Sequence, residues 1–203
     1  MRTIPRATLL LGLLLAAVPA WAAPTLFSIV PGEDGNQVSL LSKAPMETVE
    51  GKTDQATGSV SVDLEDLRAG CRVEVRVDLA SIDTGIGKRN QHMRENHLET
   101  DKYPHAVFTA DSVVATSGAA LAPGASATLT LAGDFALHGV TRRIEVPVTV
   151  TRSADGRALG VASTFDVKLA DYEISRPKFL IMKLDEVQHV TVALTAHSRG
   201  QEG

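Results

Sequence analysis

The sequence predicts an all-β protein in which antiparallel strands close into an eight-stranded barrel with one short inserted helix. Apolar and polar residues alternate with a period of two in eight or nine segments, short turns join most of these segments, and only one stretch near the middle is typical of a helix. Strands with one dry face must stack as a sandwich or close on themselves, and repeated hairpin connections favour an up-and-down barrel. A β-sandwich is the alternative.

The beginning of the barrel is predicted from four adjoining segments. Residues 26–30 form a short apolar strand, residues 31–35 form a turn rich in glycine and acidic residues, and residues 38–43 form a second strand. Residues 45–54 are expected to be a connection.

The clearest strand spans residues 71–79, where five apolar side chains alternate with four charged ones. Residues 58–64 alternate in the same way, and Ala69-Gly70 makes a tight turn between the two segments. These two strands are therefore predicted to form a hairpin.

The helix is predicted over residues 86–95, with Asp83 or Thr84 as its N-terminal cap. Its weak apolar stripe consists of Ile86, Asn90, Met93 and His97. Tyr103-Pro104 ends this segment and returns the chain to extended structure.

Five further strands are predicted at residues 106–114, 127–137, 144–150, 159–169 and 187–196. Residues 138–141 and Asp155-Gly156 are expected to be turns between consecutive strands. Residues 117–124 form a loop of small residues, and residues 170–184 interrupt the alternation before the last strand.

Residues 1–22 are predicted to be a secretory signal peptide that is cleaved after Ala22. Arg2 and Arg6 give a basic start, residues 7–18 form an apolar stretch too short to span a bilayer, and small residues precede the cleavage point. An uncleaved anchor is the alternative. The mature domain is then residues 23–203, and its expected location is the periplasm or the secreted fraction.

The composition of the mature chain indicates which partners to expect. Loss of Arg2 and Arg6 moves the net charge from −4 to −6, whereas nucleic-acid binding needs a basic face, so no nucleic-acid partner is expected. No second apolar stretch is long enough to span a membrane. Cys71 is the only cysteine, which excludes an internal disulfide, and its place on a dry strand face predicts a buried, inert thiol.

The residues give no catalytic or metal-binding motif. His92 and His97 are five residues apart, which does not place them on one helical face, and a single cysteine leaves no compact zinc pattern. Asp83 is better explained as a cap or turn former than as an acid–base partner of His92. His189 and His197 are predicted to be solvated on the wet face of the last strand. We therefore expect no enzymatic activity, no metal and no cofactor.

Several motifs occur together and in order. They are Ser81-Ile82-Asp83-Thr84-Gly85, Arg89-Asn90-Gln91-His92-Met93, Tyr103-Pro104 followed by Phe108, and His138-Gly139-Val140-Thr141-Arg142 after Gly133. With these motifs the chain resembles the YceI-like family of secreted, lipocalin-like domains associated with polyisoprenoid or lipid binding. The resemblance covers most of the mature chain. Departures at Val38-Ser39-Leu40, at His97-Leu98 and at residues 175–179 indicate a divergent branch.

The resemblance implies a lipocalin-like barrel with an elongated apolar cavity that holds an isoprenoid or fatty chain. The candidate ligand-binding residues on its inner face are Leu40, Val62, Val75, Leu79, Phe108, Leu131, Phe135, Val146, Val161, Phe165 and Leu194. The candidates for closing its mouth are Met93, Phe179 and Ile181. Ordinary core packing is the alternative role for each of them.

Three functions follow from this reading, in order of preference. The first is a periplasmic or secreted protein that sequesters or carries an amphiphilic isoprenoid or other lipid. The second is a filled barrel that acts as a protein-interaction or structural module, and the third is a hydrolase or isomerase that uses the cavity as a substrate pocket. A homodimer is a further expectation, because strand edges or the barrel mouth could pair two copies.

Overall fold

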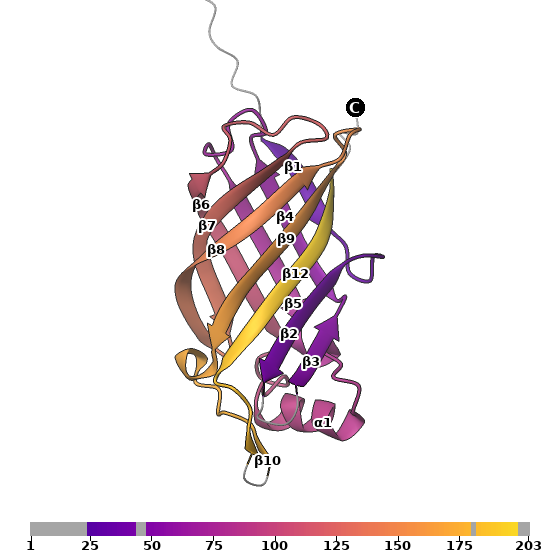
Figure 1. Ribbon diagram of the computed structural model, residues 1–203, viewed down its shortest axis with the longest axis vertical. Coiled ribbons are helices and arrows are strands. Elements are labelled where there is room, and N and C mark those ends of the chain that lie inside the picture. The colour runs from indigo at the N-terminus through magenta and orange to yellow at the C-terminus, as the bar shows by residue number, and fades with distance from the viewer. Residues whose placement is uncertain (1–23, 44–47, 180–181, 199–203) are drawn as a thin grey trace, which may run out of the picture.

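A computed structural model describes residues 24–43, 48–179 and 182–198, which form a closed antiparallel barrel whose strands are tilted to its long axis (Figure 1). The predicted signal peptide lies outside the described residues. In the described part, eight strands follow one another around the ring, and β1 pairs with β12 to close it. These strands are β1 (Thr25–Ile29), β4 (Ala56–Val62), β5 (Arg72–Asp78), β6 (His105–Thr116), β7 (Ser126–Leu137), β8 (Val140–Arg152), β9 (Ala158–Lys168) and β12 (Val187–Ser198).

A second hairpin extends the wall of the barrel toward one end. It consists of β2 (Gln37–Lys43) and β3 (Thr48–Thr53). β2 pairs with β12 at His189–Ala193, whereas β1 pairs with β12 at its last residues, so β1 and β2 lie along the same edge in succession. β3 in turn contacts the barrel through an antiparallel bridge between Lys52 and Asp83. From β4 to β9, consecutive strands are neighbours in the wall, whereas β2 pairs with β12 and β1 pairs with β4 and β12. The predicted closed antiparallel barrel of eight strands is confirmed.

The prediction that residues 45–54 are a connection is wrong for Thr48–Thr53, which is β3. Its inward positions are occupied by Val49, Gly51 and Thr53, which are buried, while the residues between them are exposed. Only one of these three side chains is strongly apolar. The alternation that marks the other strands is therefore too weak here to be read from the sequence.

Two features of the sequence let β6 and β7 curve tightly. The β6–β7 register skips a residue between Ala110 and Ser112 and again between Val113 and Ala115, which indicates two bulges. Opposite the first bulge, a Cβ atom on Gly133 would lie 2.3 Å from the carbonyl oxygen of Thr109. Only glycine therefore fits at this position of the wall.

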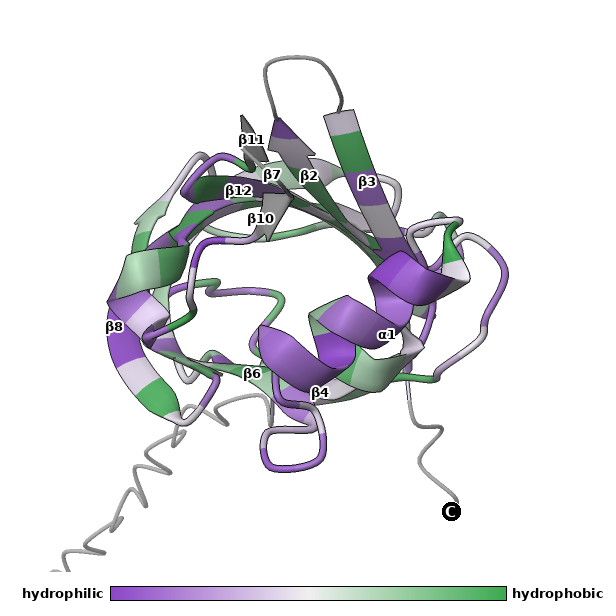
Figure 2. Cartoon of the chain, turned by 90° about the horizontal axis from the view of Figure 1, so that it is seen from below, coloured by the Kyte–Doolittle hydropathy of each residue, from purple (hydrophilic) through white to green (hydrophobic). Residues whose placement is uncertain are grey.

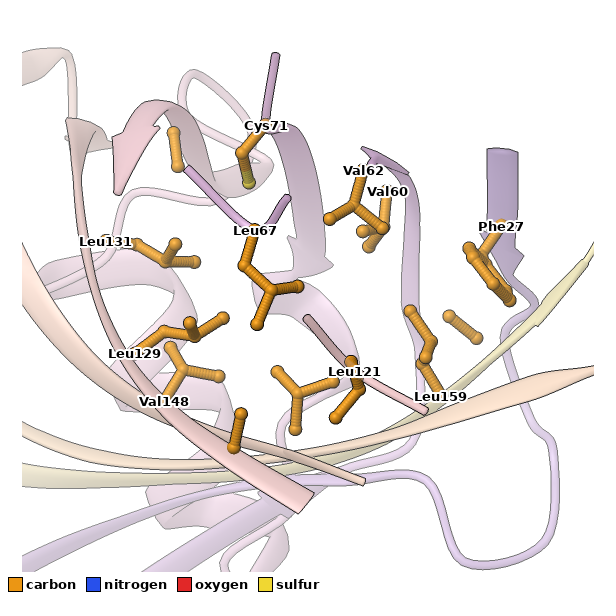
Figure 3. Close-up of a cluster of buried hydrophobic side chains, with 14 of the residues drawn as sticks. Phe27, Val60, Val62, Leu67, Cys71, Leu121, Leu129, Leu131, Val148 and Leu159 are labelled. Atoms are coloured by element: carbon orange, nitrogen blue, oxygen red, sulfur yellow. The ribbon is translucent and has the colours of Figure 1, made fainter. Parts of the chain in front are cut away.

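The barrel is plugged at the end opposite the helix. Leu67 and Leu121 come from two loops and are almost fully buried together with Leu129 and Leu159 (Figure 3). Backbone hydrogen bonds join the loops, because the Leu67 amide donates to the carbonyl of Ala119 at 2.7 Å and the Leu121 amide donates to that of Leu64 at 2.8 Å. The plug therefore belongs to the core of the domain.

The other end of the barrel carries α1 (Gly87–Asn96), which lies across part of the opening (Figure 2). The short elements near this end are the 3₁₀ helices η1 (Leu79–Ser81) and η2 (Leu169–Tyr172) and the two-residue strands β10 (Lys178–Phe179) and β11 (Met182–Lys183). Among the described residues, no helix has the length and apolar character needed to cross a membrane.

The prediction that Asp83 or Thr84 caps α1 is wrong, because Ile86 is the N-terminal cap residue and its side chain makes no capping hydrogen bond. Instead, Asp83 Oδ1 accepts hydrogen bonds from the Gly85 amide at 2.8 Å and from Asn90 Nδ2 at 2.6 Å. Thr84 donates to Asn90 Oδ1 from its amide and its hydroxyl. These bonds fix the turn before α1 through a side chain of the helix and not through its backbone.

Candidate functional site

The barrel encloses a cavity of about 310 Å³ with an almost entirely apolar wall. One water molecule occupies about 30 Å³ in the liquid, so the cavity has room for about ten. Residues from β1, from the β2–β3 hairpin and from every other strand of the wall line it. The cavity reaches from Leu121 in the plug to Met93 on α1, so it follows the barrel axis for most of its length.

Twelve of the fourteen predicted ligand-binding residues line this cavity. They are Leu40, Val62, Val75, Leu79, Met93, Phe108, Leu131, Phe135, Val146, Val161, Phe165 and Leu194. The side chain of Phe179 and the whole of Ile181 lie outside the described part of the structure. The cavity is also lined by residues that were not predicted, among them Ser42 and Val49 on the extra hairpin, Leu64 and Leu121 in the plug, and Ile174 after η2.

The inner face of β5 shows that the barrel is hollow and not filled. Val73, Val75 and Val77 point inward and line the cavity, yet each remains partly accessible, while the charged residues between them face outward. A valine in a packed core has neighbours on all sides and no accessible surface. The exposed surface of these inward side chains therefore faces the cavity.

Cys71, immediately before β5, also lines the cavity and is 5% exposed. Burial raises the pKa of its thiol above the ordinary value of 9.0. The thiolate is the reactive form, so the buried position disfavours reaction. Burial of Cys71 was predicted, and the structure confirms it.

Polar side chains are most numerous at the α1 end of the cavity wall, where Thr84, Arg89, His92, His97 and Gln188 line it. The other polar residues of the wall, Ser39, Ser42, Thr53 and Ser163, lie on strands. Arg89 is half-buried, and its guanidinium donates from Nε to Thr84 Oγ1 at 2.9 Å and from Nη2 to the Thr84 carbonyl at 2.7 Å. Arg89 therefore helps to hold the turn that positions α1 across the mouth.

His97 at the C-terminal end of α1 is fixed from the opposite side of the mouth. Its Nδ1 lies 3.0 Å from the carbonyl oxygen of Ser175, and the ring of His92 packs edge-on against it with centroids 5.0 Å apart. Burial lowers the pKa of His97, the neighbouring His92 lowers it further, and the bond to Ser175 opposes both effects. The neutral imidazole is the favoured form.

Three of the other histidines have structural partners. His138 in the β7–β8 turn bonds to the Tyr172 carbonyl and to Glu99. His189 and His197, predicted to be solvated, are partly exposed, and each also contacts a carboxylate, on Asp166 and on Glu33 respectively. In the described part of the chain, no three His, Cys, Asp or Glu side chains form a group that could hold a metal ion.

Comparison with known proteins gives one family. The model of the YceI-like domain matches residues 33–196. The UPF0312 protein VPA0850 of Vibrio parahaemolyticus is 28% identical over 131 residues, which are 62% of this chain and 65% of the relative. Protein YceI of Shigella flexneri is 30% identical over 111 residues, 52% of this chain and 53% of the relative. The chain thus spans less than two thirds of the length of these curated relatives.

Solved structures share the fold at low sequence identity. A polyisoprenoid-binding domain from Saccharophagus degradans has a TM-score of 0.67 and 20% identity, covering 87% of this chain and 99% of that domain. BcnA of Burkholderia cenocepacia has a TM-score of 0.66 and 18% identity, covering 79% of this chain and 95% of that one. The barrel fold of this chain is therefore shared by these proteins.

Proposed function

The chain belongs to the YceI-like domain family, and from this premise we propose that it is an exported binding protein that carries one amphiphilic isoprenoid or fatty-chain lipid in its barrel cavity. The observation that carries the proposal is the long apolar cavity, plugged at one end and bordered by polar groups at the other. A structurally similar domain from Saccharophagus degradans binds polyisoprenoid, which supports the same ligand class here.

The physical chemistry of the cavity favours a chain-like ligand. An apolar cavity does not hold water well, because water molecules there find no hydrogen-bond partners. Transfer of an alkyl or isoprenoid tail from water into such a space gains about 0.8 kcal/mol per buried methylene. A slot that follows the barrel axis accepts a linear tail, while its polar end can face the headgroup.

The alternative of a filled barrel that serves only as an interaction or structural module receives less support. A cavity with room for about ten water molecules exceeds the small voids of an ordinary core. An enzymatic role also receives less support, because the described part of the cavity wall holds no carboxylate beside a histidine, a common arrangement for acid–base catalysis. We propose binding without catalysis.

Export is part of the proposal and rests on residues 1–22, whose basic start and apolar stretch are typical of a signal peptide. An amphiphile with an apolar tail is poorly soluble in an aqueous compartment, so a carrier there has a clear role. N-terminal sequencing of protein recovered from the periplasmic and culture fractions should give a chain that begins at Ala23. A chain retained in the cytoplasm with its first residues intact would contradict export.

The binding function is tested by native mass spectrometry of protein purified from a bacterial host, followed by solvent extraction. We expect a bound mass that organic solvent removes and that is an isoprenoid or fatty-chain lipid. Val75→Trp, which fills the cavity, should lose this mass, and Glu74→Gln on the outer face of the same strand should keep it. The same spectrum tests the expected homodimer. Recovery of no lipid, together with no uptake of a fluorescent fatty chain, would contradict the proposal.

A further inference from the structure

Two buried polar atoms that belong to cavity-lining residues have no hydrogen-bond partner. They are Ser42 Oγ and His97 Nε2. Among the described side chains, the only other such atom is Nε of Arg152, a residue whose Nη1 donates to the Leu121 carbonyl in the plug, at the far end of the barrel. Buried polar atoms are nearly always paired, so two unpaired atoms bordering one cavity require an explanation.

Ser42 lies on β2 and is 1% exposed. It shares the inward face of the strand with Val38 and Leu40, and it stands opposite Val49 of β3. An alanine at this position would pack equally well without a hydroxyl. The hydroxyl can both donate and accept one hydrogen bond, and its neighbours in the wall are chiefly apolar.

His97 presents an acceptor. Nδ1 of His97 lies 3.0 Å from the carbonyl oxygen of Ser175 and 3.2 Å from its hydroxyl oxygen. The carbonyl is the nearer partner and can only accept, so we assign the proton to Nδ1, which donates to the carbonyl. In the neutral ring, Nε2 is then left with its lone pair. A ligand atom that bonds to Nε2 must therefore be a donor.

Hydrogen bonds place both residues on the rim of the same mouth. Lys43, the neighbour of Ser42, accepts a bond from the Asp185 amide at 2.7 Å, and the Leu184 amide donates to the Pro177 carbonyl at 3.1 Å. This segment continues back to Ser175, which holds His97. Pro177 and Leu184 line the cavity as well, so hydrogen bonds link the end of the strand that carries Ser42 to the segment that holds His97.

We propose that the mouth of the cavity selects an uncharged hydroxyl headgroup, so that the preferred ligand is a long-chain alcohol. This inference rests on the proposed lipid-binding function and specifies its headgroup. The hydroxyl of the ligand donates to His97 Nε2 and accepts from Ser42 Oγ. One group that is both donor and acceptor satisfies both unpaired atoms, and its tail enters the apolar slot.

A charged headgroup fits these two atoms less well. At neutral pH a carboxylate has no proton to give, and a phosphate monoester, with a second pKa of about 6, has mostly lost its last proton. Its oxygens would then face the lone pair of Nε2, and its charge would lose hydration at a half-buried site. Arg89 is the cation of the described cavity wall, and it already donates to Thr84 from two of its nitrogen atoms. A plain hydrocarbon gains the apolar burial but leaves both polar atoms unpaired.

The selectivity is measured with three ligands that share one tail: geranylgeraniol, geranylgeranyl monophosphate and the parent hydrocarbon. Each competes with a fluorescent apolar dye for the cavity of the full mature chain. We expect the alcohol to bind about tenfold or more tighter than the phosphate, and about 2- to 10-fold tighter than the hydrocarbon, the range that one net hydrogen bond confers. Phosphate binding that equals or exceeds alcohol binding would overturn the headgroup inference.

Two variants test the assigned atoms. Ser42→Ala should weaken alcohol binding by about 2- to 10-fold and leave hydrocarbon binding unchanged, while the ligand-free protein unfolds at the same or a higher temperature, because an unpaired hydroxyl has been removed. His97→Gln should reduce the preference for the alcohol over the hydrocarbon. Ser126→Ala, which alters an exposed serine outside the cavity wall, is the matched control and should change neither.

The outcomes separate this inference from the function on which it rests. If none of the three ligands displaces the dye, the lipid-binding function fails and the inference fails with it. If all three bind alike, or if Ser42→Ala lowers thermal stability without changing alcohol affinity, the cavity binds lipids but the hydroxyl site is wrong.

Discussion

The imidazole Nδ1 of His97 lies 3.0 Å from the backbone carbonyl oxygen of Ser175, which joins the end of α1 to the segment after η2 across the barrel mouth. Seventy-eight residues separate the two in sequence. This bond and the Ser175 hydroxyl, 3.2 Å from the same nitrogen, hold the ring in place. When Nδ1 donates to the carbonyl, Nε2 is the acceptor on which the proposed hydroxyl site depends.

The first prediction concerns pH. Burial and the neighbouring His92 hold the pKa of His97 below its ordinary value of 6.5. The unfolded chain therefore binds a proton at His97 more readily than the folded chain does. Neutral His97 thus contributes to the free energy of unfolding above pH 6.5, and this contribution is lost as the pH falls through the lowered pKa. A protonated ring has no lone pair on Nε2, so alcohol affinity should fall over the same interval.

The measurement is the affinity for geranylgeraniol in a pH series with wild-type protein, His97→Gln and His92→Gln. The decrease in alcohol affinity at acidic pH should vanish in His97→Gln, which lacks the titrating ring. It should persist in His92→Gln, which keeps His97. Arg89 keeps its charge throughout this range and so does not contribute to the decrease. An identical decrease in wild type and His97→Gln would show that a different group is responsible.

The second prediction compares a packed leucine with a cavity-facing valine. Leu67 in the plug is 1% exposed, so Leu67→Ala should lower the free energy of unfolding by about 2–5 kcal/mol. Val75 already faces the cavity on one side and has fewer contacts to lose, so Val75→Ala should cost roughly 1 kcal/mol. Urea unfolding of the ligand-free proteins measures both values. Equal costs would mean that the barrel is packed around Val75 in solution.

The third prediction concerns the wall where β6 bulges. Gly133→Ala should destabilise the fold by at least the roughly 1–3 kcal/mol of an overpacked core, because the new methyl group meets the backbone carbonyl of Thr109 and a backbone atom cannot step aside. Gly118→Ala is the control, since its nearest atom would be 3.6 Å away. Thermal unfolding of the two variants tests this prediction. Similar melting temperatures would contradict the close approach of Gly133 to the backbone of Thr109.

The strength of alternation explains how much of this fold could be read from the sequence. Residues 71–79 were placed correctly because valines at every second position leave one interpretation, and the inward ones line the cavity. The strand Thr48–Thr53 was missed because glycine and threonine occupy two of its three inward positions. The plug was missed for another reason: Leu67 and Leu121 lie in loops that meet through hydrogen bonds between distant segments, and no local period records such a meeting.

The candidate site divides in the same way. Inward strand residues such as Leu131 and Phe165 follow from the period of two, because one face of each strand must be dry. Ser42 and His97 could not be predicted in this way. They stand out because Ser42 Oγ and His97 Nε2 have no hydrogen-bond partner, and only the folded structure shows which groups surround them. The useful sequence signal was a serine at an inward position of a strand, between otherwise apolar neighbours.

The fourth prediction concerns acid stability. Asp111, at the first bulge of β6, receives two hydrogen bonds from the Arg143 guanidinium at 2.7 and 3.0 Å, and these bonds with the Ser112 hydroxyl hold the pKa of Asp111 at about 2. Its folded pKa lies below the ordinary value of 3.8, so the contribution to stability is present above pH 3.8 and is lost as the pH falls toward 2.

Asp111→Asn should therefore reduce the loss of stability between pH 3.8 and 2, relative to the value at neutral pH. Urea unfolding at a series of acidic pH values gives this difference. Asp134→Asn is a suitable control, because Asp134 lies 3.8 Å from the same guanidinium and makes no bidentate bond. The pair is exposed, so added salt should weaken the difference. An acid profile unaltered by Asp111→Asn would rule out a contribution from this pair.

The last prediction concerns the length of the ligand. Each further methylene that enters the apolar slot should gain about 0.8 kcal/mol, which is about a fourfold decrease in Kd, until the tail meets the plug. Beyond that length the affinity should stop rising, because added carbons would remain in water. A series of straight-chain alcohols, measured by displacement of a fluorescent dye, locates this limit.

Leu121→Ala tests whether the plug sets the limit. Leu121 lines the inner end of the cavity and is 1% exposed, so its shortening should let longer alcohols gain affinity beyond the wild-type limit, despite a less stable fold. Val30→Ala, at an exposed position outside the cavity wall, should leave the limit unchanged. An affinity that rises without limit in wild type would mean that the tail leaves the barrel, whereas one that is independent of tail length would mean that the tail never enters it.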